Sequence, residues 1–280
     1  MKRRFSLSYL TLACNPHETI AHAASAGYDL AGLRMLPALE GGKAFPLFAD
    51  PGLLTETITC LRDTGIGILD VEIAKIDGRN AVDDWLPMLE AADRLGAGTV
   101  IAAGDDPDRS RMQDTFSALC EAAASFNLCV NLEFTPWTAV CDARMARRIV
   151  EQSGASNAQV LIDTIHVARS TTTLADLSAI PASHMSYVQI CDAPPGIPTS
   201  REELLFTARQ ERLLPGEGGV DIEGQLAALP ADLIVSVEVP SHNRIAQYGA
   251  AEWARRTLEA SRQTVERFDA RRTKPVSVRA

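Results

Sequence analysis

Short apolar runs of strand length alternate with amphipathic stretches of helix length along almost the whole chain. Eight runs predict strands, near residues 5–10, 29–36, 66–76, 98–103, 128–134, 159–165, 186–191 and 232–239. Amphipathic stretches predict helices near 16–27, 51–64, 82–95, 110–126, 141–154, 173–180 and 246–267. Because parallel strands joined by helices are covered on both faces, this alternation predicts an α/β fold.

Local signals support the predicted helix boundaries. Asn15-Pro16 and Asp50-Pro51 place proline at the first position of a helix, where its missing N–H has no intrahelical partner. Glycines that fit the left-handed residue after a helix follow four predicted helices, at Gly27, Gly65, Gly96 and Gly154.

The chain length favours one barrel over an open sheet. A (β/α)8 TIM barrel takes about 250 residues as one domain, and the chain has 280. We predict a single-domain barrel over residues 1–268 and a disordered tail over 269–280. An open doubly wound sheet is the alternative, but no GxGxxG or Walker A sequence follows a predicted strand. The long segment 193–231 is either a lid over the site or a surface insertion.

Composition narrows the partners and the location. A net charge of -9 and a pI near 5.1 disfavour a nucleic-acid partner, which needs a basic face. No apolar run approaches the roughly 20 residues of a membrane span, so no membrane partner is expected. The start of the chain vaguely resembles a signal peptide, but residues 5–12 alternate polar with apolar side chains, as a strand does. Six cysteines without a CxxC pair favour a cytoplasmic location.

Four predicted strands in the second half each end on an oxygen donor. These donors are Glu133, Asp163, Gln189 and Glu238. The carboxyl ends of barrel strands meet on one face, so we expect the four side chains to lie together. Three carboxylates and one amide oxygen form a ligand set that suits Mg²⁺ or Mn²⁺. The sequence therefore predicts a metal-dependent enzyme.

The motifs around these donors resemble those of the xylose-isomerase-like TIM-barrel superfamily. They read Asn131-Leu132-Glu133-Phe134, Asp163-Thr164-Ile165-His166, Val188-Gln189-Ile190-Cys191-Asp192, Pro215-Gly216-Glu217-Gly218 and Ser236-Val237-Glu238. The superfamily includes sugar and sugar-phosphate isomerases and epimerases, hydroxypyruvate isomerase, inosose dehydratase and endonuclease IV. Each motif is weak alone, but all fall in order.

The resemblance implies one divalent metal ion held by Glu133, Asp163, Gln189 and Glu238. Mn²⁺ or Mg²⁺ is favoured, and Co²⁺ or Zn²⁺ also suits such a site. The third ligand is often histidine in the epimerase and dehydratase branches, so Gln189 resembles the hydroxypyruvate isomerase branch more closely. Endonuclease IV is a poor match, because it uses a histidine-rich zinc site and this chain has five histidines and a negative charge.

The resemblance also implies that Glu133 and Glu238 act as acid/base catalysts. The metal would polarise the carbonyl of a small hydroxy-carbonyl substrate, and a carboxylate would move the α-proton through an enediolate. We therefore expect an isomerase or epimerase of a sugar, sugar phosphate or keto acid. A lyase of the inosose or dehydroshikimate dehydratase type shares the first step, and a non-catalytic sugar-binding barrel is a third alternative. Many relatives form homo-oligomers.

Further residues are candidates for substrate binding. The D-x-x-H motif places His166 near the metal or a substrate oxygen, although a structural role is the alternative. Arg169 and Arg212 offer planar donor forks for a carboxylate, phosphate or hydroxyl, or are surface arginines. Glu72 either faces the barrel mouth or pairs with Lys75 or Arg34. Trp137 either forms a wall of the pocket or packs in the core. His242 follows the last ligand and is the sixth candidate.

Overall fold

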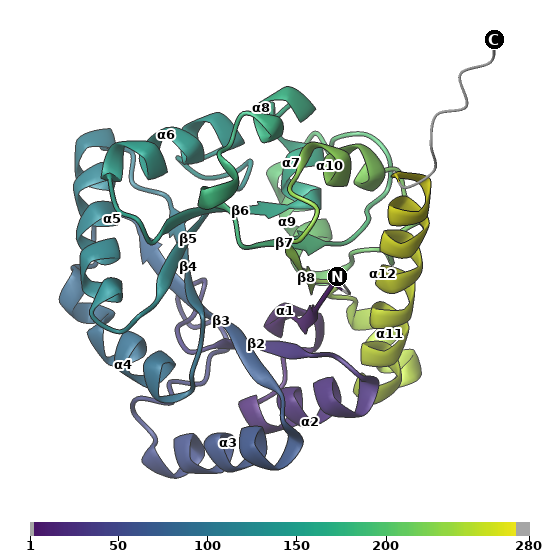
Figure 1. Cartoon of the computed structure of the whole chain (residues 1–280), viewed down its shortest axis with the longest axis horizontal. Helices are drawn as coiled ribbons and strands as arrows, with labels where there is room; N and C mark the ends of the chain where they lie inside the picture. The colour runs from purple at the N-terminus through teal and green to yellow at the C-terminus, as the bar shows by residue number, and fades with distance from the viewer. Residues whose placement is uncertain (1–2, 273–280) are drawn as a thin grey trace.

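The computed structural model describes residues 3–272 and shows a closed barrel of eight parallel strands in chain order (Figure 1). The strands are β1 (Phe5–Leu7), β2 (Leu30–Arg34), β3 (Gly67–Ile76), β4 (Thr99–Gly104), β5 (Cys129–Glu133), β6 (Ala158–Asp163), β7 (Tyr187–Ile190) and β8 (Ile234–Val237). Strand β1 pairs with both β2 and β8, which closes the sheet. The predicted TIM barrel is thereby confirmed.

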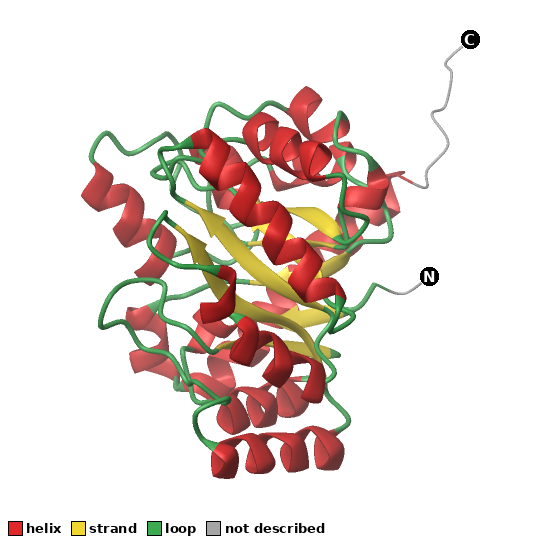
Figure 2. Ribbon diagram, turned by 90° about the vertical axis from the view of Figure 1, so that its left-hand side faces the viewer, coloured by secondary structure: helices red, strands yellow, loops and turns green. Residues whose placement is uncertain are grey.

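Helices form an outer layer around the strands, as the side view in Figure 2 shows. The larger ones are α2 (Pro16–Ala26), α3 (Pro51–Thr64), α4 (Leu86–Arg94), α5 (Arg109–Ala124), α6 (Ala143–Ser153), α9 (Arg201–Gln210) and α12 (Ala250–Arg272). Shorter ones are α1 (Tyr9–Leu12), η1 (Val82–Asp84), α7 (Thr164–Arg169), α8 (Leu174–Ser178), η2 (Ala182–His184), α10 (Ile222–Ala228) and α11 (His242–Tyr248).

The helix boundary signals act as the sequence predicts. Helix α2 begins at Pro16, and the Asn15 side chain accepts a hydrogen bond from the Glu18 backbone N–H. Helix α3 begins at Pro51, with Asp50 capping it through the Leu53 N–H.

The apolar core lies mainly between the sheet and the helices. Its largest fully buried side chain is Trp253 of α12, which donates its indole N–H to the carbonyl of Val239, just after β8. A second, smaller cluster fills the inside of the barrel with Leu30, Leu69, Ile73, Ile101, Leu161 and Tyr187. The inside of the barrel is therefore a packed core rather than a channel.

Several strands end one to three residues before the predicted limit, and for β1 and β6 side-chain hydrogen bonds explain the earlier end. Strand β1 ends at Leu7, because the hydroxyls of Ser8 and Thr11 bond to Glu238 and to the Val237 carbonyl and turn the chain into α1. Strand β6 ends at Asp163, whose carboxylate accepts a hydrogen bond from the Ile165 N–H and so caps helix α7.

The connection between β7 and β8 is more ordered than the sequence indicates. Residues 193–231 contain helices α9 and α10, which the sequence analysis does not predict. At the other end of the chain, the predicted helix 246–267 is divided at Gly249, and α12 continues to Arg272, beyond the predicted domain boundary at 268. The rest of the predicted tail, 273–280, lies outside the described residues. Within 3–272, no helix combines the length and apolarity that crossing a membrane requires.

Candidate active site

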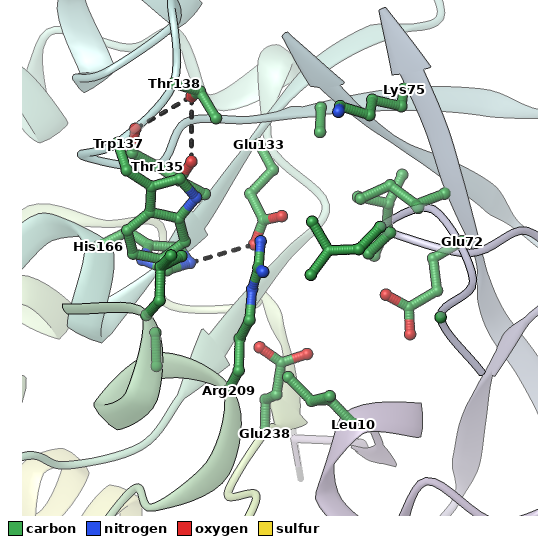
Figure 3. A pocket seen from close by; sticks show the side chains of 18 of the residues that line it. Leu10, Glu72, Lys75, Glu133, Thr135, Trp137, Thr138, His166, Arg209 and Glu238 are labelled. Carbon is green, nitrogen blue, oxygen red and sulfur yellow. Dashed lines mark hydrogen bonds and ion pairs between the residues drawn. The ribbon is translucent and has the colours of Figure 1, made fainter. Parts of the chain in front are cut away.

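Strand geometry gathers the predicted ligands at one end of the barrel. Glu133 ends β5, Asp163 ends β6, Gln189 lies in β7, and Glu238 follows β8. Asp163 is in register with Gln189, and Gln189 with Ser236, two residues before Glu238. A cavity of about 340 Å³ opens here (Figure 3), at the small end of the range typical of ligand sites.

Glu133, Asp163 and His166 form the part of the site best arranged for a metal ion. His166 Nε2 lies 3.6 Å from Glu133 Oε1 and 3.5 Å from Asp163 Oδ2, and one donor atom from each residue lies within 4.8 Å of the others. Burial, with a contribution from the Arg212 charge, lowers the pKa of His166 to about 3. The imidazole is therefore neutral at physiological pH and keeps a lone pair for a metal.

The Glu133 carboxyl group is buried among other acidic side chains. Burial raises its pKa well above the ordinary value, and the negative charges of Glu238 and Asp163 add to the effect. Within the described chain its only ion-pair partner is the neutral His166. A divalent cation would replace this repulsion with attraction, so Glu133 fits a metal ligand.

Gln189 and Glu238 form the opposite side of the site. The Gln189 amide donates from Nε2 to Glu238 Oε1 over 3.2 Å, an orientation set by the carboxylate, which can only accept. The amide oxygen of Gln189 is left buried without a hydrogen-bond partner. A buried carbonyl oxygen without a donor is unfavourable, and coordination to a cation would satisfy it. The donor set therefore fits a hard divalent ion.

Arg212 joins the two sides of the site. Its guanidinium is 2 % exposed and lies 2.7 Å from Asp163 Oδ2 and 2.8 Å from Glu238 Oε2. It also donates to the backbone carbonyls of Ala208 and Glu238. The two carboxylates keep further lone pairs that a metal can use. Arg212 is thus a fixed positioning group for two of the predicted ligands.

The Pro215–Gly218 motif acts through Asp192 rather than through the pocket. The buried Asp192 carboxylate accepts hydrogen bonds from the backbone N–H groups of Gly216, Gly218 and Val220. A side chain at Gly218 would clash with Asp192 and with the Ala193 carbonyl. The motif therefore holds the chain that follows Arg212 close to the end of β7.

The structure places four of the six predicted substrate-binding residues on the pocket, namely Glu72, Trp137, His166 and Arg212. Glu72 pairs with Arg34 over 2.7 Å, whereas Lys75 pairs with Asp77 over 3.5 Å. Trp137 packs edge-on against His166, with 5.1 Å between ring centroids. The tryptophan thus forms the apolar wall beside the metal-ligand candidates.

The other two predicted residues lie away from the cavity. Arg169 donates to the carbonyl of Pro194 over 2.6 Å, so it anchors the start of the β7–β8 connection. His242 is the first residue of α11 and is exposed. Neither lines the pocket. Arg169 and His242 are close in sequence to Asp163 and Glu238, but they lie on α7 and α11, and their side chains point away from the cavity.

Sequence reasoning missed Ser8 and Arg209. Ser8, which directly follows the barrel's first strand, donates to Glu238 over 2.7 Å, a pairing that nothing local in the sequence signals. Arg209 reaches the pocket from α9. A signal was present, because the pocket-lining residues Leu205, Ala208, Arg209 and Arg212 recur at helical spacing.

The sequence matches the family model described as a xylose isomerase-like TIM barrel over residues 20–264. The match covers most of the chain, so the protein belongs to this family. Comparison with curated proteins gave no match.

Solved structures share the fold at low sequence identity. The IolI protein with a bound zinc atom has a TM-score of 0.80 and 17% identity, covering 95% of this chain and 99% of that chain. A xylose isomerase-like TIM barrel/4-hydroxyphenylpyruvate dioxygenase fusion protein has a TM-score of 0.80 and 20% identity, covering 99% of this chain but 46% of that one. D-allulose 3-epimerase from Methylomonas sp., in complex with D-allulose, has a TM-score of 0.68 and 16% identity, covering 94% and 98%.

Replacing Arg212 with Met should destabilise the metal-free protein by about 3–5 kcal/mol, because Asp163 and Glu238 would remain buried without their shared counter-charge. Urea unfolding in the presence of EDTA measures the difference. Arg62→Met is the matched control, since the Arg62 side chain is 74% exposed. A loss no larger than that of the control would contradict the positioning role of Arg212.

Glu133→Gln should stabilise the metal-free protein at alkaline pH. The folded chain holds a proton on Glu133 that the unfolded chain releases above its ordinary pKa of 4.5, so stability falls as pH rises from there through the raised folded pKa. Gln removes this penalty. In thermal melts with EDTA, the variant should melt above the wild type at pH 8, with a smaller gap at pH 5. Glu121→Gln, at an exposed position, is the control; a wild type that melts higher at pH 8 would refute the assignment.

Proposed function

We propose that the protein is a divalent-metal-dependent isomerase or epimerase of a small hydroxy-carbonyl compound. The observation that carries this proposal is the convergence of Glu133, Asp163, His166, Gln189 and Glu238 on one end of the barrel. The cavity above them has room for a molecule of monosaccharide size. The bound zinc of the IolI protein and the D-allulose of the epimerase support the proposal by analogy of fold.

Glu133, Asp163, Gln189 and Glu238 would hold the metal, and His166 is close enough to join them. When bound, Mn²⁺ or Mg²⁺ would polarise the substrate carbonyl and lower the cost of removing the neighbouring proton. The neutral His166 imidazole offers a ligand or a hydrogen-bond donor to a substrate oxygen.

The two glutamates differ in how they are held, and this difference suits proton transfer. Glu238 accepts hydrogen bonds from Ser8 and Gln189 and pairs with Arg212, so its position is fixed. Glu133 has only the long contact to His166, and burial raises its pKa well above the ordinary value. A raised pKa makes a carboxylate a stronger base than an ordinary glutamate. We assign Glu133 and Glu238 as the two acid/base groups, with Glu133 the more mobile proton carrier.

Purified wild-type protein should contain about one divalent ion per chain, because a single site of this donor set binds one cation. Glu133→Ala/Asp163→Ala should remove the ion, and Gln189→Ala, which keeps Arg212 paired, should weaken metal affinity without unfolding the chain. Metal analysis and Mn²⁺ titration measure both effects, and Glu121→Ala is the control at an exposed position. Absence of metal from the wild type after Mn²⁺ loading would overturn the proposal.

Glu133→Gln and Glu238→Gln should each reduce turnover by about 10²–10⁴-fold, the usual contribution of a positioned acid or base. The substrate panel consists of ketoses, hydroxypyruvate and inososes with added Mn²⁺. Mass spectrometry detects deuterium that enters the α-carbon from D₂O when an isomerase returns the proton. A dehydratase instead loses water after the proton has been removed, which lowers the mass of the product. Full activity in both variants would refute the roles of these glutamates.

A further inference from the structure

Arg209 enters the pocket without a carboxylate partner. It projects from α9 into the cavity beside Glu133 and Glu238 (Figure 3). The Arg209 guanidinium lies 5.7 Å from the centroid of the Trp137 ring and forms no ion pair with any of the described residues. The two other arginines deep in the site are already paired, Arg34 with Glu72 and Arg212 with Asp163 and Glu238. Arg209 is therefore a half-buried arginine whose N–H donors are available to a ligand.

The contact with Trp137 leaves the N–H donors of Arg209 available to bind a ligand. A guanidinium carries five N–H donors, and a contact with an aromatic ring does not occupy them with an acceptor oxygen. Those N–H groups form a fork that matches the two oxygens of a carboxylate. Arg209 therefore presents donors to the cavity.

The charge around the cavity also favours an anionic ligand. Six cationic side chains line it, Arg34, Lys43, Lys75, Arg201, Arg209 and Arg212, against four acidic ones, Glu72, Asp105, Glu133 and Glu238. Asp163, buried behind the lining, adds a fifth acid. A divalent cation would add two positive charges to this near balance. The whole chain carries -9, so the positive surplus is local to the site.

We propose that the substrate carries a carboxylate in addition to its hydroxy-carbonyl unit, and that the Arg209 side chain binds this carboxylate. The proposal rests on the proposed function for the position of the hydroxy-carbonyl end, at the metal ligands. It narrows the substrate class from sugars and keto acids in general to acidic ones. It also assigns α9, within residues 193–231, a direct part in substrate selection.

The electrostatic environment of Arg209 agrees with this assignment. Burial lowers its pKa, and the nearby charge of Arg34 acts in the same direction, whereas Glu133 opposes the shift. A half-buried cation that repels its neighbours is unfavourable in the empty site. An anion bound at the guanidinium would relieve that repulsion.

A carboxylate fits this position better than a phosphate. A phosphate dianion has three acceptor oxygens, and proteins usually satisfy them with several donors, often including backbone N–H groups at a helix N-terminus. Arg209 lies near the C-terminus of α9 and supplies one two-pronged fork; Arg201, at the N-terminus of α9, also lines the cavity but is exposed. Two oxygens match that fork without leaving a third unsatisfied.

Three ligands that differ only at C6 test the proposal: D-glucuronate, D-glucose and D-glucose 6-phosphate. Each is titrated into Mn²⁺-loaded protein, and binding is followed by tryptophan fluorescence. Trp137 lines the pocket, whereas Trp85 and Trp253 are 2% and 0% exposed. The variants are Arg209→Gln, and Arg62→Gln as a control that removes the same charge from an exposed position.

We expect wild type to bind glucuronate about tenfold or more tightly than glucose, as charged hydrogen bonds to one carboxylate provide. Arg209→Gln should lose this preference, and Arg62→Gln should keep it. Equal binding of glucuronate and glucose, whether tight or too weak to detect, would overturn the proposal. Preference for the phosphate ester, or a glucuronate preference that survives in Arg209→Gln, would overturn it too. Because the titration needs no turnover, this proposal and the proposed reaction can fail separately.

Discussion

The site depends on one buried ion-pair arrangement, in which the guanidinium of Arg212 lies between the carboxylates of Asp163 and Glu238. These acids come from β6 and from the end of β8, and their charges would repel each other if both were buried alone. Two fixed donors in one rigid plane also define where the carboxylate oxygens lie. Hydrogen bonds from Gly216 and Gly218 to Asp192 hold the backbone that follows Arg212 close to the end of β7.

The candidate site contains buried polar groups that lower the stability of the metal-free protein. Glu133 is buried with a raised pKa, and the Gln189 amide oxygen and His166 Nδ1 have no hydrogen-bond partners. Deeper in the barrel, the Asn131 amide donates to Thr99 and Gln159, and its oxygen is also left without a partner. At the candidate site, a bound metal or substrate would supply partners for Gln189 and His166.

The connection between β7 and β8 is long and contains two helices. Most of the barrel is strand, helix and short turn, but residues 193–231 add α9 and α10. Arg169 holds the start of this connection, and Asp192 holds the backbone of residues 216–220 within it. Between these anchors, α9 delivers Leu205, Ala208 and Arg209 to the cavity. The strand ends thus supply the candidate metal ligands, and the connection supplies a wall of the cavity, as loops commonly do on barrel scaffolds.

The sequence by itself determined the barrel, the order of its strands and the strand-end positions of Glu133, Asp163, Gln189 and Glu238, because hydrophobic period and helix-end signals are local properties. Only the tertiary structure decided which side chains meet. Ser8 reaches Glu238 across the closure of the barrel, 230 positions away in sequence. His166 faces the site while Arg169, one helical turn later, faces away, since α7 turns between them. The place of Arg209 beside Trp137 likewise follows from how α9 packs, and packing of distant segments is not encoded in any single stretch of sequence.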